Sequence, residues 1–280
     1  MNGKRMAYNK AVLILLWAAA GLTCALLLGL IGVIFVRGLP HVTWQLLTSQ
    51  ESVIRGVDGV LPNIINTVVL VVGTLLLVLP LGVSAAVYLT EYATNRRVTA
   101  LIEFATETLT GIPSILFGLV GMLVFTQLFG WGSSIRAGIL TLVIMILPTI
   151  VRTTQESLKT VPQSYREAAL GLGSGKWHMI RTVVLPSSVD GIVTGCILAV
   201  GRIVGESAAL LYTAGSASVL VGSLGRLITT PGGSLTVSLY RYAMERGQIE
   251  TGFAIASILM ILTACINLSA KLVGRKWRRT

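Results

Sequence analysis

Six long apolar stretches limit this chain to folds that lie in a lipid bilayer. Each approaches or exceeds the roughly 20 residues that an α-helix needs to cross the hydrocarbon core. They are predicted at residues 11–36, 64–89, 112–129, 135–151, 191–212 and 252–273. Of the 280 residues 54% are hydrophobic and only 12% are charged, about half the charged fraction of a soluble domain. We therefore predict an all-α integral membrane protein with six transmembrane helices.

The predicted crossings divide the chain into three parts. Residues 1–61 hold a first helix, which is expected to be retained rather than cleaved as a signal peptide, and an extracytoplasmic loop. Residues 62–273 hold the other five helices, and residues 274–280 form a basic tail. Pro80 is expected to kink the second helix. The amphipathic stretch 98–110 is expected at the membrane interface before the third.

The basic residues predict which side of the membrane each loop occupies. The side that holds both termini carries 15 of the 22 Lys and Arg residues, and the opposite side carries six. Because loops rich in Lys and Arg stay in the cytoplasm, both termini are predicted to be cytoplasmic. The positive charge, +11 in total, clusters at the ends of apolar runs without an aromatic-rich basic face. This pattern argues against a nucleic-acid partner.

The longest polar segment on the predicted cytoplasmic side, residues 152–190, has the pattern of two short helices. Ser164 begins a Ser-x-x-Glu sequence, the spacing of a capping box at a helix start. Gly171 and Gly173 are placed to end that helix with a left-handed cap. A second short helix is expected over residues 175–184 and is expected to end at Pro186.

The same loop resembles the EAA loop of ABC importer permeases. That pattern reads Glu-Ala-Ala, three residues, Gly, nine residues, Ile-x-Leu-Pro. It is matched here, with Val in place of Ile, by Glu167, Ala168, Ala169, Gly173, Val183, Leu185 and Pro186. The resemblance, which covers about residues 63–268, implies the type I ABC importer permease fold, in which this loop is a coupling helix docked on a separate ATPase. A capped hairpin with no docking role is the alternative.

The fifth predicted crossing contains a charged pair. Arg202 and Glu206 are four residues apart and would share one face of a continuous helix. An arginine near the bilayer centre costs about 2.5–3.5 kcal/mol on insertion scales, so it is expected to face a water-filled path or a counter-charge. Two interpretations stay open: an anion pathway, in which Arg202 binds the substrate, and a structural ion pair. Four glycines on this segment are expected to permit close helix approach: Gly191, Gly195, Gly201 and Gly205.

The surroundings of this pair resemble phosphate permeases. Their Gly-Arg-Ala-x-Gly-Glu-Thr-Ala pattern is followed here with Ile203 for Ala and Ser207 for Thr. Residues 239–243 are more similar to the A than to the C permease subunit. The resemblance implies phosphate transport, with Arg202, Glu206 and Ser207 on the pathway. Composition and periodicity alone support only an anion-compatible permease.

The resemblance also implies partners and a location. The family's usual assembly, in the bacterial inner membrane, has two permease subunits on two ATP-binding subunits, and an extracytoplasmic binding protein delivers inorganic phosphate. Residues 172–177 are superficially like a nucleotide-binding loop, but the first glycine and the Ser or Thr after Lys176 are missing. ATP and Mg are therefore expected on a partner chain, and no cofactor, metal or catalytic residue is assigned to this one.

Two other classes of function are alternatives. An ion-coupled anion transporter or channel working without an ATPase would also suit Arg202 and Glu206, but it leaves the EAA pattern unexplained. An intramembrane enzyme has less support, because the only histidines, His41 and His178, lie in predicted loops without an H-E-x-x-H pattern. Co-purification with an ATPase subunit distinguishes the permease from the first alternative.

Overall fold

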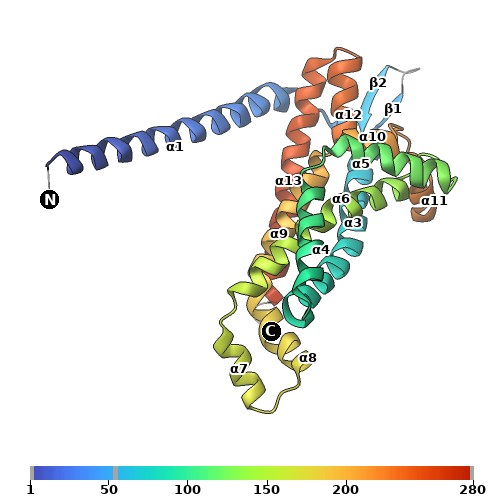
Figure 1. Ribbon diagram of the computed structural model, residues 1–280. Helices are drawn as coiled ribbons and strands as arrows, with labels where there is room; N and C mark the ends of the chain where they lie inside the picture. Colours follow the sequence, from blue (N-terminus) through green and yellow to red (C-terminus); the bar gives the residue numbers. More distant parts are fainter. Residues whose placement is uncertain (1–2, 53–55, 278–280) are drawn as a thin grey trace.

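The computed structural model describes residues 3–52 and 56–277, with side chains over 8–52 and 56–274. Figure 1 shows an elongated helical bundle from which α1 (Gly3–Gly38) diverges. The long helices of the bundle are α3 (Leu61–Val87), α6 (Ile135–Thr160), α9 (Leu185–Gly205) and α13 (Ile249–Trp277). The shorter helices are α2 (Trp44–Thr48), α4 (Arg96–Thr110), α5 (Ser114–Gly121), α7 (Gln163–Gly171), α8 (Lys176–Met179), α10 (Ala208–Thr213), α11 (Leu224–Thr229) and α12 (Leu235–Tyr240). A 3-10 turn, η1 (Leu39–His41), and four π-helical turns complete the helical elements: η2 (Tyr88–Tyr92), η3 (Met122–Leu128), η4 (Ile180–Val184) and η5 (Arg241–Glu245).

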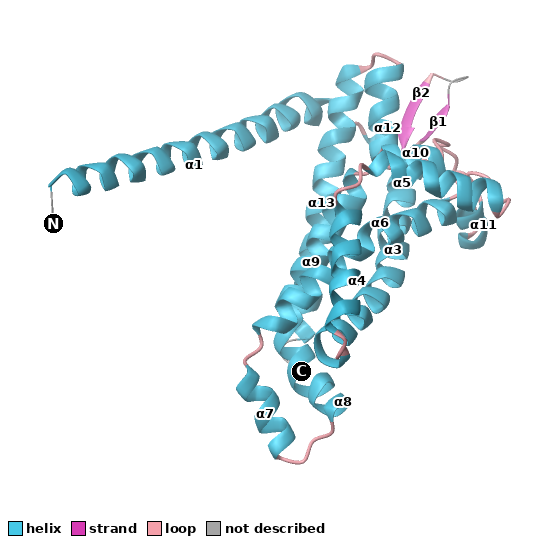
Figure 2. Cartoon of the chain, in the orientation of Figure 1, coloured by secondary structure: helices cyan, strands magenta, loops and turns pink. Residues whose placement is uncertain are grey.

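The two ends of the bundle differ in structure (Figure 2). At one end, β1 (Gln50–Ser52) and β2 (Val57–Val60) form an antiparallel hairpin. The sequence did not predict this hairpin, because strands of three and four residues are too short to show a clear alternating pattern. The loop that carries α7 and α8 lies at the opposite end. We call these the hairpin end and the loop end.

Helix α6 is the central helix of the bundle. In its most apolar segment 67% of the residues are buried, compared with 0% in that of α1. The main core joins α3, α6 and α9 through residues such as Leu70, Leu142 and Ile203, which are at most 2% exposed. Helix α6 therefore packs against the other core helices along its length and runs between the hairpin end and the loop end.

Glycines determine how closely α9 approaches α6. A Cβ at Gly191 or Gly195 would lie 2.2 Å or 2.4 Å from a hydroxyl oxygen of α6. The expected close approach is confirmed for these two glycines. Gly201 and Gly205 lie on an open face, with no described atom within 4 Å of the Cβ that a larger residue would add.

Helix α1 joins the rest of the chain through its C-terminal end. There the Ser257 hydroxyl of α13 donates to the Ile34 carbonyl at 3.0 Å. Gly38 packs so closely on α13 that a Cβ would lie 2.2 Å from the Phe253 carbonyl oxygen. Most large apolar side chains of α1 are exposed, as suits a helix surrounded by lipid or by another membrane subunit.

Among the described residues, five helices are long and apolar enough to cross a bilayer alone: Tyr8–His41, Leu61–Tyr92, Ile135–Thr160, Lys176–Gly205 and Ile249–Gly274. A sixth crossing arises if α4 and the α5–η3 helix, which meet at a bend of 99°, count as one. The third crossing, predicted at residues 112–129, corresponds to the α5–η3 helix (Ser114–Leu128), which reaches span length only together with α4. Pro113 has an extended ψ of 136° at the start of α5, which separates α5 from α4. Pro80 lies inside α3, and the kink expected there stays a prediction. The boundaries of the three predicted parts of the chain also stay predictions.

Candidate coupling loop and substrate pathway

The α7–α8 loop projects from the loop end of the bundle (Figure 1). Its bend is a glycine cap. Gly173 has φ of +82°, its N–H donates to the Leu170 carbonyl at 2.9 Å, and the Ser174 N–H donates to the Ala169 carbonyl at 3.1 Å. This pair of bonds is the Schellman arrangement, which satisfies carbonyls at the end of α7. The predicted left-handed cap is confirmed at Gly173, whereas Gly171 is still the last residue of α7.

The predicted capping box at Ser164 is wrong. Helix α7 begins at Gln163, with Pro162 at its N-cap, and no side chain caps it. Ser164 is thus already the second helical residue, where its backbone N–H needs a partner and its side chain cannot serve as the cap. Glu167, the other member of the expected box, is exposed.

Pro186 does not end the second helix of the loop, as the sequence predicted. Helix α8, the π turn η4 and α9 form one continuous helix over Lys176–Gly205, with Pro186 in the first turn of α9. A proline inside an α-helix loses one hydrogen bond and clashes with the preceding turn. The π turn directly before it changes the spacing of that turn. The second short helix is therefore an extension of the fifth crossing.

The EAA residues divide into an exposed set and a packed set. Glu167 and Ala168 are exposed, whereas Ala169 is buried. Val183 and Leu185 pack on the apolar cluster at the base of the loop, and Pro186 is exposed. The large apolar side chains of Tyr165, in the first turn of α7, and of Leu172 and Trp177, near the bend, are 54%, 89% and 59% exposed. The loop thus has a packed base and an apolar exposed tip.

The helix that was expected to carry both Arg202 and Glu206 ends between them. Helix α9 stops at Gly205, and Glu206 has an extended backbone, with ψ of 116°. The Glu206 carboxylate is buried, 8% exposed as a residue, and accepts from the Ala209 N–H at 2.9 Å. Glu206 therefore caps α10. Within the described side chains, Arg202 forms no ion pair with it, so the predicted pair within one helix is wrong.

Ser207 lies beside a small cavity close to the point where α9 ends. The cavity, of about 220 Å³, lies among α5, α10 and α12 and is lined by Ile115, Ser207, Ala208, Leu211, Tyr212, Val237 and Tyr240. Helices α5 and α10 cross closely because Gly118 has no side chain. A Cβ there would lie 2.7 Å from the Ala209 Cα. Of the predicted pathway residues, Ser207 thus lines this cavity, and Arg202 lies one turn before the end of α9.

The sequence pattern of the binding-protein-dependent transport system inner membrane components matches residues 78–279. The chain belongs to this family. It is 35% identical over 268 residues to the probable ABC transporter permease protein YqgI of Bacillus subtilis, which covers 91% of each chain. It is 34% identical over 287 residues to the phosphate transport system permease protein PstA 2 of Mycobacterium bovis, covering 98% of this chain and 93% of the relative. To the PstA protein of Yersinia pestis the identity is 33% over 251 residues, 86% and 81% of the two chains.

Solved structures confirm the fold of this permease. A bacterial alginate ABC transporter, in complex with an alginate pentasaccharide-bound periplasmic protein, gives a TM-score of 0.69 at 14% identity, over 99% of this chain and 98% of the other. The inward-facing MetNI methionine ABC transporter gives 0.58 at 20% identity, over 84% and 96%. The expected type I ABC importer permease fold of a multi-pass membrane protein is therefore correct.

An arginine that the sequence reading did not single out anchors the coupling loop of the permease. Arg166 of α7 donates to the Glu91 carboxylate of η2 at 2.9 and 3.1 Å. It also donates to the carbonyls of Leu158 at 2.9 Å and Val161 at 2.6 Å. The two charged side chains are only 12% and 7% exposed. Their separation of 75 residues left no local signal, although Arg166 directly precedes the EAA residues.

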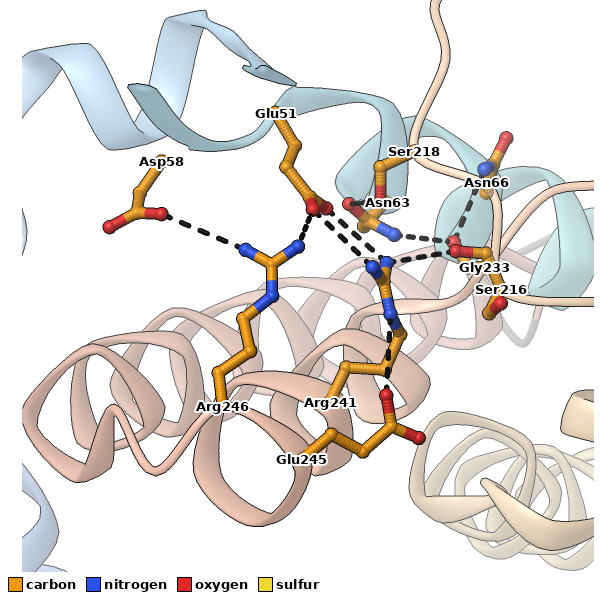
Figure 3. A network of polar contacts seen from close by, with 10 residues as sticks. All are labelled: Glu51, Asp58, Asn63, Asn66, Ser216, Ser218, Gly233, Arg241, Glu245 and Arg246. Atoms are coloured by element: carbon orange, nitrogen blue, oxygen red, sulfur yellow. Dashed lines mark hydrogen bonds and ion pairs between the residues drawn. The ribbon is translucent and has the colours of Figure 1, made fainter. Parts of the chain in front are cut away.

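A second network, partly buried, lies at the hairpin end of the permease (Figure 3). Arg241 donates to both carboxylate oxygens of Glu51 at 3.3 Å and to the Ser216 carbonyl at 3.0 Å. Arg246 pairs with the same carboxylate and lies 3.9 Å from Asp58. These contacts fix the β1–β2 hairpin to η5 and to the chain that follows α10. The surrounding sequence, residues 239–243, resembled a permease motif, but no signal pointed to Glu51.

A pair of asparagines fixes another part of the hairpin end to α3. Asn63 and Asn66, both buried, donate to the Gly233 carbonyl at 2.9 and 3.2 Å. The Ser218 hydroxyl donates to the Asn63 side-chain oxygen at 3.1 Å.

In the described part of the chain no three His, Cys, Asp or Glu residues are placed to hold a metal ion.

Proposed function

We propose that this permease is a subunit of an ATP-driven phosphate importer and that its α7–α8 loop docks on a separate ATPase subunit. The phosphate assignment is supported by the full-length similarity to proteins named as phosphate transport permeases. Within that similarity, residues 201–208 follow the phosphate permease pattern. Neither ATP nor Mg is bound by this chain in the proposal, and both belong to the ATPase.

The coupling role is supported by the exposed apolar side chains of the loop and by the contacts that hold the loop in place. An isolated hairpin in water gains nothing from exposing large apolar side chains, whereas exposed apolar side chains in a group are typical of protein contacts. Leu172 and Trp177 are 89% and 59% exposed at the tip. The glycine cap and the Arg166 contacts hold this tip in one arrangement. A preorganised apolar surface is what a docking element requires.

The orientation follows from the same proposal. The ATPase is a cytoplasmic protein, so the loop end faces the cytoplasm and the hairpin end faces outward. The excess of basic residues in the segments at the loop end supports this orientation. Both termini are then cytoplasmic. The remaining partners are a second permease subunit, the second ATP-binding subunit, the bilayer and an extracytoplasmic phosphate-binding protein at the hairpin end.

Within the pathway, Arg202 is the proposed phosphate ligand. Its guanidinium has five N–H donors that match phosphate oxygens in pairs. Because Glu206 is engaged in capping α10, it does not compete for these donors. The open face beside Gly201 and Gly205 leaves room for an anion to approach the end of α9. Ser207, on the adjacent cavity, is a candidate hydroxyl donor.

The experiment is purification of the intact complex, followed by ATPase and uptake assays with labelled phosphate in liposomes. Leu172→Asp with Trp177→Asp is expected to prevent co-purification of the ATPase. Leu224→Asp is the control, because Leu224 is 71% exposed at a site remote from the loop. Arg202→Ala is expected to abolish uptake while the complex still assembles. Full uptake by the chain alone, without any ATPase, would contradict the proposal and favour an ion-coupled transporter.

A further inference from the structure

We infer that Arg166 and Glu91 are positioning residues through which the coupling loop moves α3 and α6, an inference that rests on the proposed function. Together with the carbonyls of Leu158 and Val161 they form what we call the Arg166 junction. It joins three elements that are distant in sequence: α7, the C-terminal end of α6, and η2 at the end of α3.

Every nitrogen of the Arg166 side chain has an acceptor in the junction. Nε donates to Glu91 at 3.1 Å, and Nη1 donates to the Val161 carbonyl at 2.6 Å. Nη2 donates to Glu91 and to the Leu158 carbonyl, both at 2.9 Å. The carbonyls lie at the negative end of the α6 dipole, which favours a cation. The planar guanidinium is suited to this multiple contact, whereas a lysine ammonium is not.

The junction is the main polar connection of α7 to the bundle. Of the nine residues of α7, all of which the structure describes, only Ala169 is buried. A cavity of about 440 Å³ adjoins the junction, lined by Thr90, Glu91, Lys159, Gln163, Arg166, Leu170, Lys176 and Met179. Side chains bordering a cavity have few packing contacts on that side. Arg166 therefore gives α7 a polar contact with the bundle, in addition to the packing of Ala169 in the apolar cluster and the direct chain connection to α6.

The other half of the loop is connected to the same π turn. The Lys176 ammonium of α8 lies 4.9 Å from the centre of the Tyr92 ring, next to Glu91 in η2. A π turn is wider than an α-helical turn and is frequent at functional positions. Because η2 continues α3 directly, displacement of η2 is transmitted to the core helix that packs on α6.

The test compares Glu91→Gln and Arg166→Lys with Glu51→Gln in the complete complex. Glu51 is a matched control, since it is a 7% exposed carboxylate paired with arginine at the opposite end. We expect the two junction variants to retain the ATPase but to reduce phosphate transported per ATP hydrolysed by about threefold to tenfold. The double variant should be no worse than the more severe single one, because the two side chains act as a pair. Glu51→Gln should lower the unfolding temperature without changing this ratio.

Either of two transport results would overturn the inference. One is an unchanged transport ratio in Glu91→Gln in a preparation whose wild-type ATPase is stimulated by phosphate. The other is an equal fall of the ratio in Glu51→Gln, which would make the effect one of general stability. Hydrogen exchange of the α7 amides is a second measurement, which needs no substrate. The exchange of these amides must be faster in Glu91→Gln than in the wild type. A wild-type complex without phosphate stimulation would contradict the proposed function, while the exchange result would still decide whether the junction positions α7.

Discussion

Glu206 accepts a hydrogen bond from the Ala209 N–H and caps α10 instead of pairing with Arg202, four residues earlier. The sequence predicted that the two residues form one ion pair, but in the structure they have different surroundings. Glu206 stabilises the start of α10, and Arg202, which is half-buried near the end of α9, has no ion pair with it among the described side chains. The break after Gly205 therefore favours the pathway interpretation of Arg202 over a structural ion pair.

Glu206→Gln is expected to retain most phosphate uptake, and Glu206→Ala is expected to lose it. Glutamine keeps a side-chain oxygen that can accept from the Ala209 N–H, whereas alanine leaves that buried donor unpaired, at a cost of about 1 kcal/mol for a lost cap. Uptake by the reconstituted complex measures both. Loss of uptake in Glu206→Gln with a normally assembled complex would show that the negative charge itself is required.

Gly173→Val is expected to disable the coupling loop. A β-branched residue at φ of +82° is strained by about 1–2 kcal/mol, so the Schellman bonds to α7 should be lost or displaced. The measurement is co-purified ATPase per permease. Gly175→Val is the control, because Gly175 has φ of −70°, which any residue can adopt. Equal ATPase retention in the two variants would contradict a role for the bend.

The sequence predicted the parts of the fold that depend on local pattern. Apolar length located the crossings, and the spacing of Gly173 after the EAA residues located the bend. The sequence failed where a distant contact decides the local structure. Nothing near Arg202 in the sequence shows that α9 will end at Gly205 and that Glu206 will accept from the Ala209 N–H.

Dependence on distant contacts also explains why the sequence did not predict the two ion networks. Arg166 and Glu91 are 75 residues apart, and Arg241 and Glu51 are 190 residues apart. Residues this far apart share no local pattern, so the sequence alone does not pair them. Pro186 was likewise predicted at a helix end, because the π turn that accommodates it leaves no clear signal in the sequence.

Gly118→Ala is expected to destabilise the permease, whereas Gly201→Ala is not. The added methyl group of Gly118→Ala would lie 2.7 Å from the Ala209 backbone, and overpacking of this kind costs about 1–3 kcal/mol. At Gly201 no described atom lies within 4 Å of an added Cβ. Thermal unfolding of the purified permease compares the two. A Gly201→Ala variant that unfolds normally but transports poorly would place this open face on the pathway or on a subunit contact.

The pH dependence of the hairpin end is expected to depend on Tyr242. Burial, reinforced by the nearby Glu51 and Asp58 carboxylates, raises the pKa of Tyr242 from 10.0 to about 12. The stability that the neutral phenol provides is complete below pH 10, where both the folded and the unfolded chain keep its proton. Between pH 10 and about 12 only the unfolded chain releases this proton, so stability falls as the pH rises.

Tyr242→Phe removes this titration, so its unfolding temperature should fall less steeply than that of the wild type between pH 10 and 12. Both proteins should have parallel profiles below that window, where the phenol is neutral. Tyr240→Phe is the matched control, because Tyr240 is 46% exposed on the preceding turn. Its profile should follow the wild type throughout. If Tyr242→Phe also followed the wild type above pH 10, the alkaline loss would have to come from other groups, and the burial of this phenol against the two carboxylates would have no effect on stability.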